Sequence, residues 1–91
     1  MAFTREQAVE RARGDLAKRL GVSEAEINEV SVENADFPDM ALGAPAKGEM
    51  SGQMITPGWR IRLNTKSIGF EYRANKSQVR LYNFRGVNYR V

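Results

Sequence analysis

Residues 59–84, WRIRLNTKSIGFEYRANKSQVRLYNF, decide the fold because apolar and polar side chains alternate through three short runs. The runs WRIRLN, IGFEYR and VRLYNF each place apolar side chains at every second position, which is the pattern of half-buried strands. The polar connections NTKS and ANKSQ have the length and composition of hairpin turns. The stretch therefore predicts an antiparallel meander of three strands over about 59–84.

The residues before the meander predict a helix over about 5–20. Thr4 and Gln7 match a capping box, in which each side chain satisfies a backbone N–H at the helix start. The apolar residues that follow recur at helical spacing and would face one side: Val9, Ala12, Leu16 and Leu20. Gly21 fits the left-handed position that ends many helices.

A second capping box, Ser23 with Glu26, predicts one short helical turn after the helix. The run EVSVEN at residues 29–34 alternates in the same way as the later strands. It predicts a fourth strand with Val30 and Val32 facing inward.

Together these elements predict a single domain over residues 1–91 of the α+β class. One N-terminal helix would pack on an antiparallel sheet of about four strands, because two layers bury both apolar surfaces. The tail at 85–91 alternates weakly, and it adds an edge strand, pairs with another copy or stays loose.

A long loop is predicted between the first strand and the meander, over about 36–56. Loops of this length are uncommon in compact domains and are usually functional or disordered. Because the segment contains prolines, glycines and apolar residues, we expect it to be ordered, with Phe37, Leu42 and Met54 at least partly buried. We expect its methionines to fill gaps in the packing, a role favoured here over the adaptable binding surfaces that methionine also suits.

Two local structures are predicted at the ends of this loop. Asp36 is expected to cap the turn ahead of Pro38; a calcium site is the less favoured interpretation, because the acidic residues lack calcium-loop spacing. In TPGW, Pro57 and Gly58 predict a type II turn or a bulge leading into the strand, with Gly58 in the left-handed position. Trp59 then shares the parity of the core-facing residues.

The composition excludes several kinds of site. The chain has no cysteine and no histidine, so it has no disulfide, no thiolate nucleophile and no ordinary zinc site, and it lacks the commonest general base. We therefore expect a non-catalytic protein without a cofactor. No apolar run approaches the ~18 residues of a membrane span, and the first residues lack a signal-peptide core. We accordingly expect no membrane association and a cytoplasmic location.

The charges are distributed unevenly along the chain. Residues 1–55 hold six Lys/Arg and ten Asp/Glu, a net charge of −4, whereas residues 56–91 hold eight Lys/Arg and Glu71 alone, a net charge of +7. The favoured interpretation is a basic, solvated sheet face, and the alternative is a nucleic-acid partner. For that alternative, basic side chains would follow a single strand and aromatic rings would stack on its bases. The residues expected on this outer sheet face are Arg60, Arg62, Arg73, Arg80, Tyr82 and Phe84.

The segments FPDMALGAP, ITPGWRIRL and FEYRANKSQVRL resemble a group of small uncharacterised bacterial domains with the pattern WPDxxLGCP…TPGYRI…YEYHT…VVL. The helix-then-meander order also resembles PepSY-type domains, which occur beside peptidases and in their propeptides. In this sequence Phe37 replaces the tryptophan of the first pattern, and Ala44 stands at its cysteine. A second cysteine of the relatives falls near Tyr82, and the resemblance therefore implies that the Ala44 region packs against the end of that strand.

The favoured expectation is a non-catalytic protein-binding module that uses the 37–57 loop. A modulator of a peptidase is one such module. A loop held in one shape loses little entropy on binding, and loops on rigid scaffolds often carry binding sites. The residues predicted to contact this unidentified protein partner are Pro45, Lys47, Glu49, Met50 and Gln53. Single-stranded nucleic-acid binding by the outer sheet face is the alternative.

Overall fold

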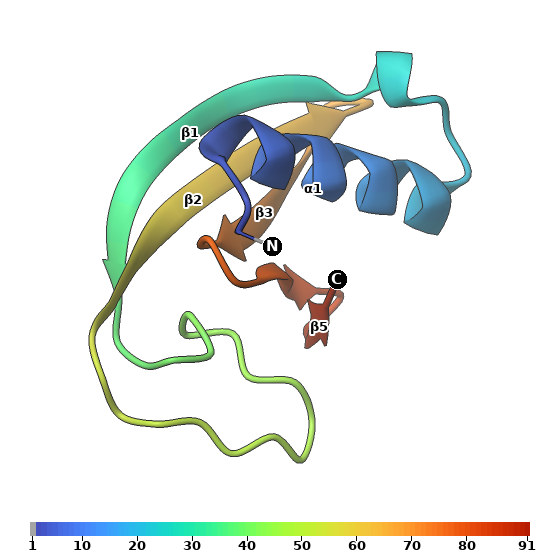
Figure 1. Ribbon diagram of the computed structural model, residues 1–91. Helices are drawn as coiled ribbons and strands as arrows, with labels where there is room; N and C mark the ends of the chain where they lie inside the picture. Colours follow the sequence, from blue (N-terminus) through green and yellow to red (C-terminus); the bar gives the residue numbers. More distant parts are fainter. Residues whose placement is uncertain (1) are drawn as a thin grey trace.

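The computed structural model describes residues 2–91, which form one α-helix, one 3-10 turn and five strands (Figure 1). The elements are α1 (Arg5–Leu20), η1 (Glu24–Glu26), β1 (Asn28–Phe37), β2 (Thr56–Thr65), β3 (Ile68–Ala74), β4 (Val79–Phe84) and β5 (Val87–Arg90). The strands lie in the order β1-β2-β3-β4-β5, and every neighbouring pair is antiparallel. The α+β class and the meander are confirmed, but the sheet has five strands rather than about four, because the tail forms β5.

The start and end of α1 follow the signals in the sequence. Thr4 Oγ1 accepts a hydrogen bond from the Gln7 backbone N–H at 3.1 Å, and the Gln7 side chain accepts one from the Thr4 N–H at 2.9 Å. Gly21 ends the helix in the left-handed conformation, with φ 66°. The predicted capping box and C-terminal glycine are therefore both confirmed.

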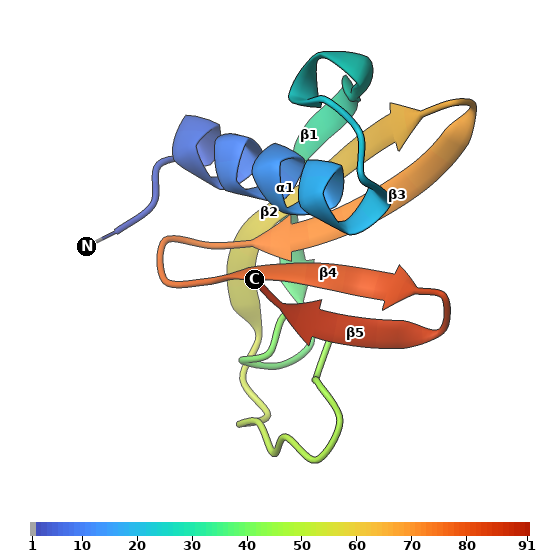
Figure 2. The same cartoon turned by 90° about the vertical axis from the view of Figure 1, so that its right-hand side faces the viewer.

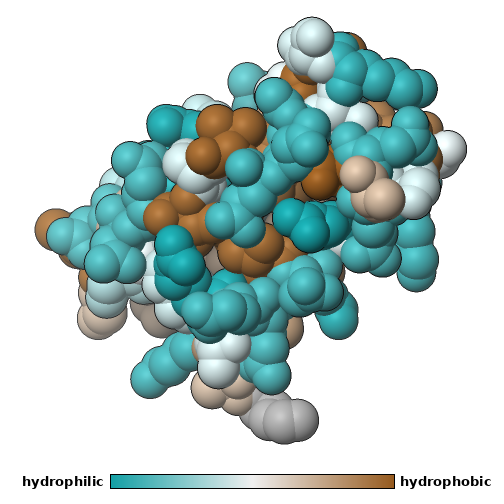
Figure 3. All heavy atoms as spheres, turned by 90° about the horizontal axis from the view of Figure 1, so that it is seen from above, coloured by the Kyte–Doolittle hydropathy of each residue, from teal (hydrophilic) through white to brown (hydrophobic). Residues whose placement is uncertain are grey.

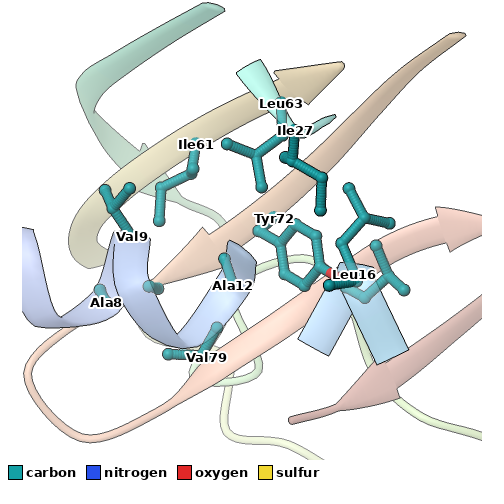
Figure 4. Packing of buried hydrophobic residues seen from close by; sticks show 12 residues of the cluster. Ala8, Val9, Ala12, Leu16, Ile27, Ile61, Leu63, Tyr72 and Val79 are labelled. Carbon is teal, nitrogen blue, oxygen red and sulfur yellow. The ribbon is translucent and has the colours of Figure 1, made fainter. Parts of the chain in front are cut away.

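The main core lies between α1 and one face of the sheet (Figure 4). Tyr72 of β3 lies at its centre and is fully buried, and its hydroxyl donates a 2.8 Å hydrogen bond to Asp15 of α1. Burial and this hydrogen bond raise the pKa of the Tyr72 phenol. Arg19 donates to the same carboxylate at 2.7 Å and lies 4.3 Å from the centroid of the Tyr89 ring in β5. Helix, central strand and last strand are thus joined through two side chains of α1.

Two irregularities change the side-chain directions predicted from alternation. Glu29 pairs with Leu63 but Ser31 pairs with Arg62, so Val30 is an extra residue in β1 and is 58% exposed. The prediction that Val30 faces inward is wrong because this bulge turns its side chain to solvent. Val32, beyond the bulge, packs against the core as predicted.

The second irregularity lies in β4, where the register to β5 shifts between Leu81 and Phe84 and Asn83 is left-handed, with φ 52°. Phe84 therefore lies on the helix side, where its ring centroid is 5.9 Å from that of Phe70 and 6.2 Å from that of Tyr89. The prediction that Phe84 shares the outer face with Tyr82 is wrong for this reason.

Gly58 lies inside β2, pairs in regular register with Ala35 and is not left-handed, so the predicted type II turn or bulge is also wrong. It is close to its neighbours instead: a Cβ at this position would lie 2.2 Å from the Ala74 carbonyl oxygen and 3.2 Å from the Phe37 ring. The lack of a side chain lets the backbones of β2 and β3 approach beside Phe37. Trp59 packs against the core as predicted.

Candidate functional site

Residues 38–55 connect β1 to β2 and lie on the opposite side of β4 and β5 from α1 (Figures 1 and 2). We call residues 38–46 the loop base and residues 47–55 the loop tip. The loop base is buried at Ala41, Leu42 and Ala44, and Phe37 at the end of β1 is buried with it. These side chains are not part of the core under α1. The sheet is therefore covered by the helix on one face and partly by the loop on the other.

A single carboxylate shapes the loop base. Asp39 Oδ1 accepts hydrogen bonds from the N–H groups of Ala41 and Gly43, each at 2.9 Å. Leu42 and Gly43 are both left-handed, with φ 60° and 66°. Asp39, and not Asp36 as predicted, is therefore the residue that caps the turn. Asp36 lies in β1 opposite Pro57.

Arg73 of β3 joins the loop base to the sheet. Its Nη1 donates to the carbonyl oxygens of Leu42 and Gly43, each at 3.1 Å, and its Nε donates to Glu71 at 2.8 Å. The guanidinium carbon lies 3.7 Å from the centroid of the Tyr82 ring and 5.3 Å from that of Phe37. Arg73 thus contacts two aromatic rings and satisfies two loop carbonyls that have no strand partner.

Arg80 of β4 joins the loop tip to the sheet. Its side chain is only 4% exposed, and it forms a two-point ion pair with Glu49 in which Nη2 donates to Oε2 at 2.8 Å. Gln78 and the Ala44 carbonyl accept its other hydrogen bonds, at 2.6 and 3.3 Å. The Arg80 hydrogen bond, together with the N–H of Ala46, lowers the pKa of Glu49 from 4.5 to about 2. Glu49 is therefore ionised at neutral pH and holds the loop tip on β4.

The other two arginines of the outer sheet face, Arg60 and Arg62, lie beside the carboxylate of Glu71. Glu71 lies 3.4 Å from Arg60 and 4.0 Å from Arg62, in addition to its bond to Arg73. Arg62 also pairs with Glu33 of β1 at 3.2 Å. The structure brings all four predicted arginines and Tyr82 onto the outer face, but each guanidinium already has a carboxylate partner there.

The loop exposes methionines that were predicted to be buried or to fill gaps in the packing. Met54 is 62% exposed, so the prediction that it is partly buried is wrong, whereas those for Phe37 and Leu42 are confirmed. Met50 is 96% exposed and Met40 is 50% exposed, which contradicts a gap-filling role for both. These methionines lie outside any periodic run, so alternation could not assign them to a face.

Four of the five residues predicted to contact a partner are exposed, namely Pro45, Lys47, Met50 and Gln53. Glu49 points to Arg80 instead. The exposed apolar loop residues that the prediction missed are Met40, Met54 and Ile55, the last at 70% exposure. In the sequence, only the position of Met54 and Ile55, at the end of the glycine-containing loop tip and before the alternating residues of β2, indicates their exposure.

The region around Ala44 packs on β4, as the resemblance implied. Ala44 is fully buried and its carbonyl accepts from Arg80, two residues before Tyr82. The Pro45 carbonyl accepts a 3.1 Å hydrogen bond from Asn88 of β5. The loop is therefore folded back on the sheet. A direct pairing of Ala44 with Tyr82 stays a prediction.

The helix-covered sheet with a long loop fixed on its outer face defines a small α+β domain with a preformed loop. A family model described as a domain of unknown function, DUF8738, matches residues 9–82, and the chain belongs to this family. The match spans most of α1, the loop and the sheet through Tyr82. The expectation of an uncharacterised domain family is thereby confirmed. No curated protein and no solved structure matches the chain.

Two features of other kinds of site are absent from residues 2–91. No group of three or more acidic, cysteine or histidine side chains is arranged in this range to hold a metal ion. No helix in the same range combines the length and the apolar character needed to cross a membrane.

Proposed function

We propose that this domain is a non-catalytic protein-binding module and that its contact surface is the loop tip together with Met40. The observation that carries the proposal is the exposure of four large apolar side chains on one segment: Met40, Met50, Met54 and Ile55. Exposed apolar side chains gathered in one place mark interaction sites more often than scattered ones do. Methionine is flexible and polarisable, so it suits contacts with a protein surface that is not rigidly complementary.

The attachment of the loop to the sheet supports the same proposal. Arg73, the Glu49–Arg80 ion pair and the Asn88 side chain, which donates to the Pro45 carbonyl, attach the loop to the sheet at three points. The Met40 N–H also donates to the Gly52 carbonyl at 2.9 Å, which joins the outgoing and returning parts of the loop. A loop that is already ordered loses less conformational entropy when it binds, and more of the contact energy appears as affinity.

The face above α1 offers less apolar surface of this kind. Seen from above, the region over β1, α1 and the β2–β3 hairpin is mostly hydrophilic, and its hydrophobic side chains lie in small separate groups (Figure 3). The loop lies on the other side of the molecule. The distribution of apolar side chains therefore favours the loop as the contact surface.

We take a peptidase or its propeptide as the first partner to test. The support for this choice is the helix-then-meander order, which resembles that of PepSY-type domains. The resemblance concerns architecture alone, and shared folds carry many functions.

Single-strand nucleic-acid binding by the outer face is the second proposal. The net charge of +7 over residues 56–91 and the presence of four arginines on one face support it. The loop covers part of that face, however, and Arg73 and Arg80 are bonded to it. If this proposal is correct, oligonucleotide affinity should fall steeply with salt and be lost in the variant R60E/R62E. Absence of binding at low salt would remove it.

The loop proposal is tested by affinity capture from a native lysate with three immobilised proteins. These are the wild type, the loop variant M50S/M54S/I55S and the control variant V30S. Val30 is similarly exposed but lies in the β1 bulge, away from the loop. We expect one partner to be enriched by the wild type and by V30S and to be lost with the loop variant. Equal enrichment by all three proteins would contradict the proposal.

A further inference from the structure

A second surface lies at the turns of the β2–β3 and β4–β5 hairpins, at the end of the sheet away from the loop. Strands β3 and β4 separate there. These strands pair only from Glu71 opposite Tyr82 to Ala74 opposite Val79. Residues 68–70 of β3 therefore have a strand neighbour on the β2 side alone, and β4 turns away at the left-handed Asn83. The β2–β3 and β4–β5 hairpins diverge there (Figure 2). Between them lies a groove of about 590 Å³, which we call the hairpin groove.

The hairpin groove is apolar on its floor. Leu20 and Val22 reach it from the end of α1 and the following turn, and Phe70 and Phe84 reach it from the two strands. Ile68 lies at its edge and is 57% exposed, although the alternation of β3 places it on the core side. The volume lies in the range of small-molecule sites, which are mostly apolar with a few convergent polar groups.

Two basic residues border the groove at the tips of the two hairpins. Lys66 precedes β3 and Arg85 follows β4, and both line the groove. Neither forms an ion pair within residues 2–91, in contrast to the arginines of the outer face. Glu71 is the one acidic residue among the described residues that line the groove, and its carboxylate already bonds Arg73. The border is therefore positively charged.

The backbone at both positions makes the presence of these side chains unusual. Lys66 and Arg85 are left-handed, with φ 52° and 53°. In tight hairpins such positions favour asparagine or glycine, because a longer side chain costs energy in this conformation. Each hairpin therefore carries a basic side chain at a strained position that faces the same groove. Strained residues of this kind often serve a functional site.

A buried hydroxyl provides a third polar group. Thr65 is only 3% exposed and lines the groove. Its Oγ1 atom has no hydrogen-bond partner within residues 2–91. Buried hydroxyls are normally satisfied, so this one lacks a partner that a polar atom of a ligand would supply.

We propose that the hairpin groove binds a small carboxylate with an apolar body. Lys66 and Arg85 contact the carboxylate, and Leu20, Phe70 and Phe84 contact the body. Thr65 offers its hydroxyl to a polar atom within the groove. The site is distinct from the loop tip, which lies at the other end of the strands, and the proposal does not depend on the partner of the loop.

The test uses the full chain, labelled with ¹⁵N, and follows its amide resonances by NMR. The probes are octanoate, octanol and octylammonium, which share the apolar chain and differ in charge. We expect saturable shifts with octanoate at Lys66, Phe70, Phe84 and Arg85, and affinity lower by roughly tenfold for octanol, since the charge-assisted contacts are lost. Octylammonium should not bind at the groove.

Two groove variants separate the apolar and charged contributions. The variant K66Q/R85Q should lower octanoate affinity by roughly tenfold and leave octanol unchanged. I68D, at an exposed position, should lower the affinity for both. The control K47Q/K76Q removes two exposed lysines elsewhere and should bind octanoate as the wild type does. Unchanged octanoate binding by K66Q/R85Q, or no saturable shifts at the groove with the wild type, would overturn the proposal.

Discussion

Replacing Glu49 by glutamine removes the charge that bonds the loop tip to Arg80 and leaves the shape of the side chain unchanged. The pKa of Glu49 falls from 4.5 to about 2 in the folded protein, and a shift of that size corresponds to about 3 kcal/mol of stability. The side chain is 21% exposed, so solvent screening reduces the expected loss to about 2 kcal/mol. Gln78 and the Ala44 carbonyl still accept from Arg80, which keeps the loss below that of a fully orphaned buried charge.

The effect should depend on pH in a defined direction. A carboxylate whose pKa is lowered by folding stabilises the protein fully above its unfolded pKa and loses that contribution as the pH falls through its folded pKa. For Glu49 the window runs from 4.5 down to about 2. The difference in unfolding free energy between wild type and E49Q should therefore be about 2 kcal/mol at neutral pH and shrink toward zero across that window.

Urea unfolding followed by Trp59 fluorescence measures this difference, because Trp59 packs against the core. The control is E10Q, which removes an exposed carboxylate of α1 that forms no ion pair within residues 2–91. A difference between wild type and E49Q that stays the same at neutral and acidic pH would refute the reasoning, as would one no larger than that of E10Q.

Three further changes have expected outcomes. Leu42→Ala should lower the unfolding free energy by about 2–4 kcal/mol, because the Leu42 side chain in the loop base is fully buried. A loss within the error of the urea experiment would show that the loop base does not pack on the sheet. Ser67→Gly should raise the melting temperature, with a gain of about 1 kcal/mol, because Ser67 is left-handed with φ 65°; a lower melting temperature would contradict the strain at this turn. The double variant A44C/Y82C should form an intramolecular disulfide on oxidation, because the loop base packs on β4 beside Tyr82. A mass loss and a gel shift would detect the disulfide. A protein that stays reduced under oxidising conditions would show that the two positions are too far apart.

The regular elements could be predicted because their periodicity is local. Thr4, Gln7 and Gly21 lie within a few residues of the helix ends that they determine, and the meander repeats at every second position. The bulges at Val30 and Asn83 carry no such periodicity, since each inserts one residue whose direction depends on the neighbouring strand. Of these two positions, only Asn83 has a residue type that indicates irregular backbone, because asparagine tolerates the left-handed conformation better than most residues.

The candidate site was less accessible to sequence reasoning, since it depends on contacts between distant parts of the chain. Glu49 and Arg80 are 31 residues apart, and nothing near either of them indicates the pairing. Arg80 alternates with Val79 and Leu81, so it was expected on a solvated face, and the loop then buries it. The same loop leaves Met54 exposed, which apolar character alone could not show.

The contact surface on the loop is tested most directly by NMR of the protein labelled at the methionine methyl groups, titrated with the partner recovered by affinity capture. The resonances of Met50 and Met54 should shift or broaden in proportion to the bound fraction. A valine-labelled sample should show the Val30 methyl resonances unchanged, because Val30 lies in the β1 bulge. Binding that leaves the Met50 and Met54 resonances unchanged and shifts those of Val30 would contradict the proposal that the loop tip is the contact surface.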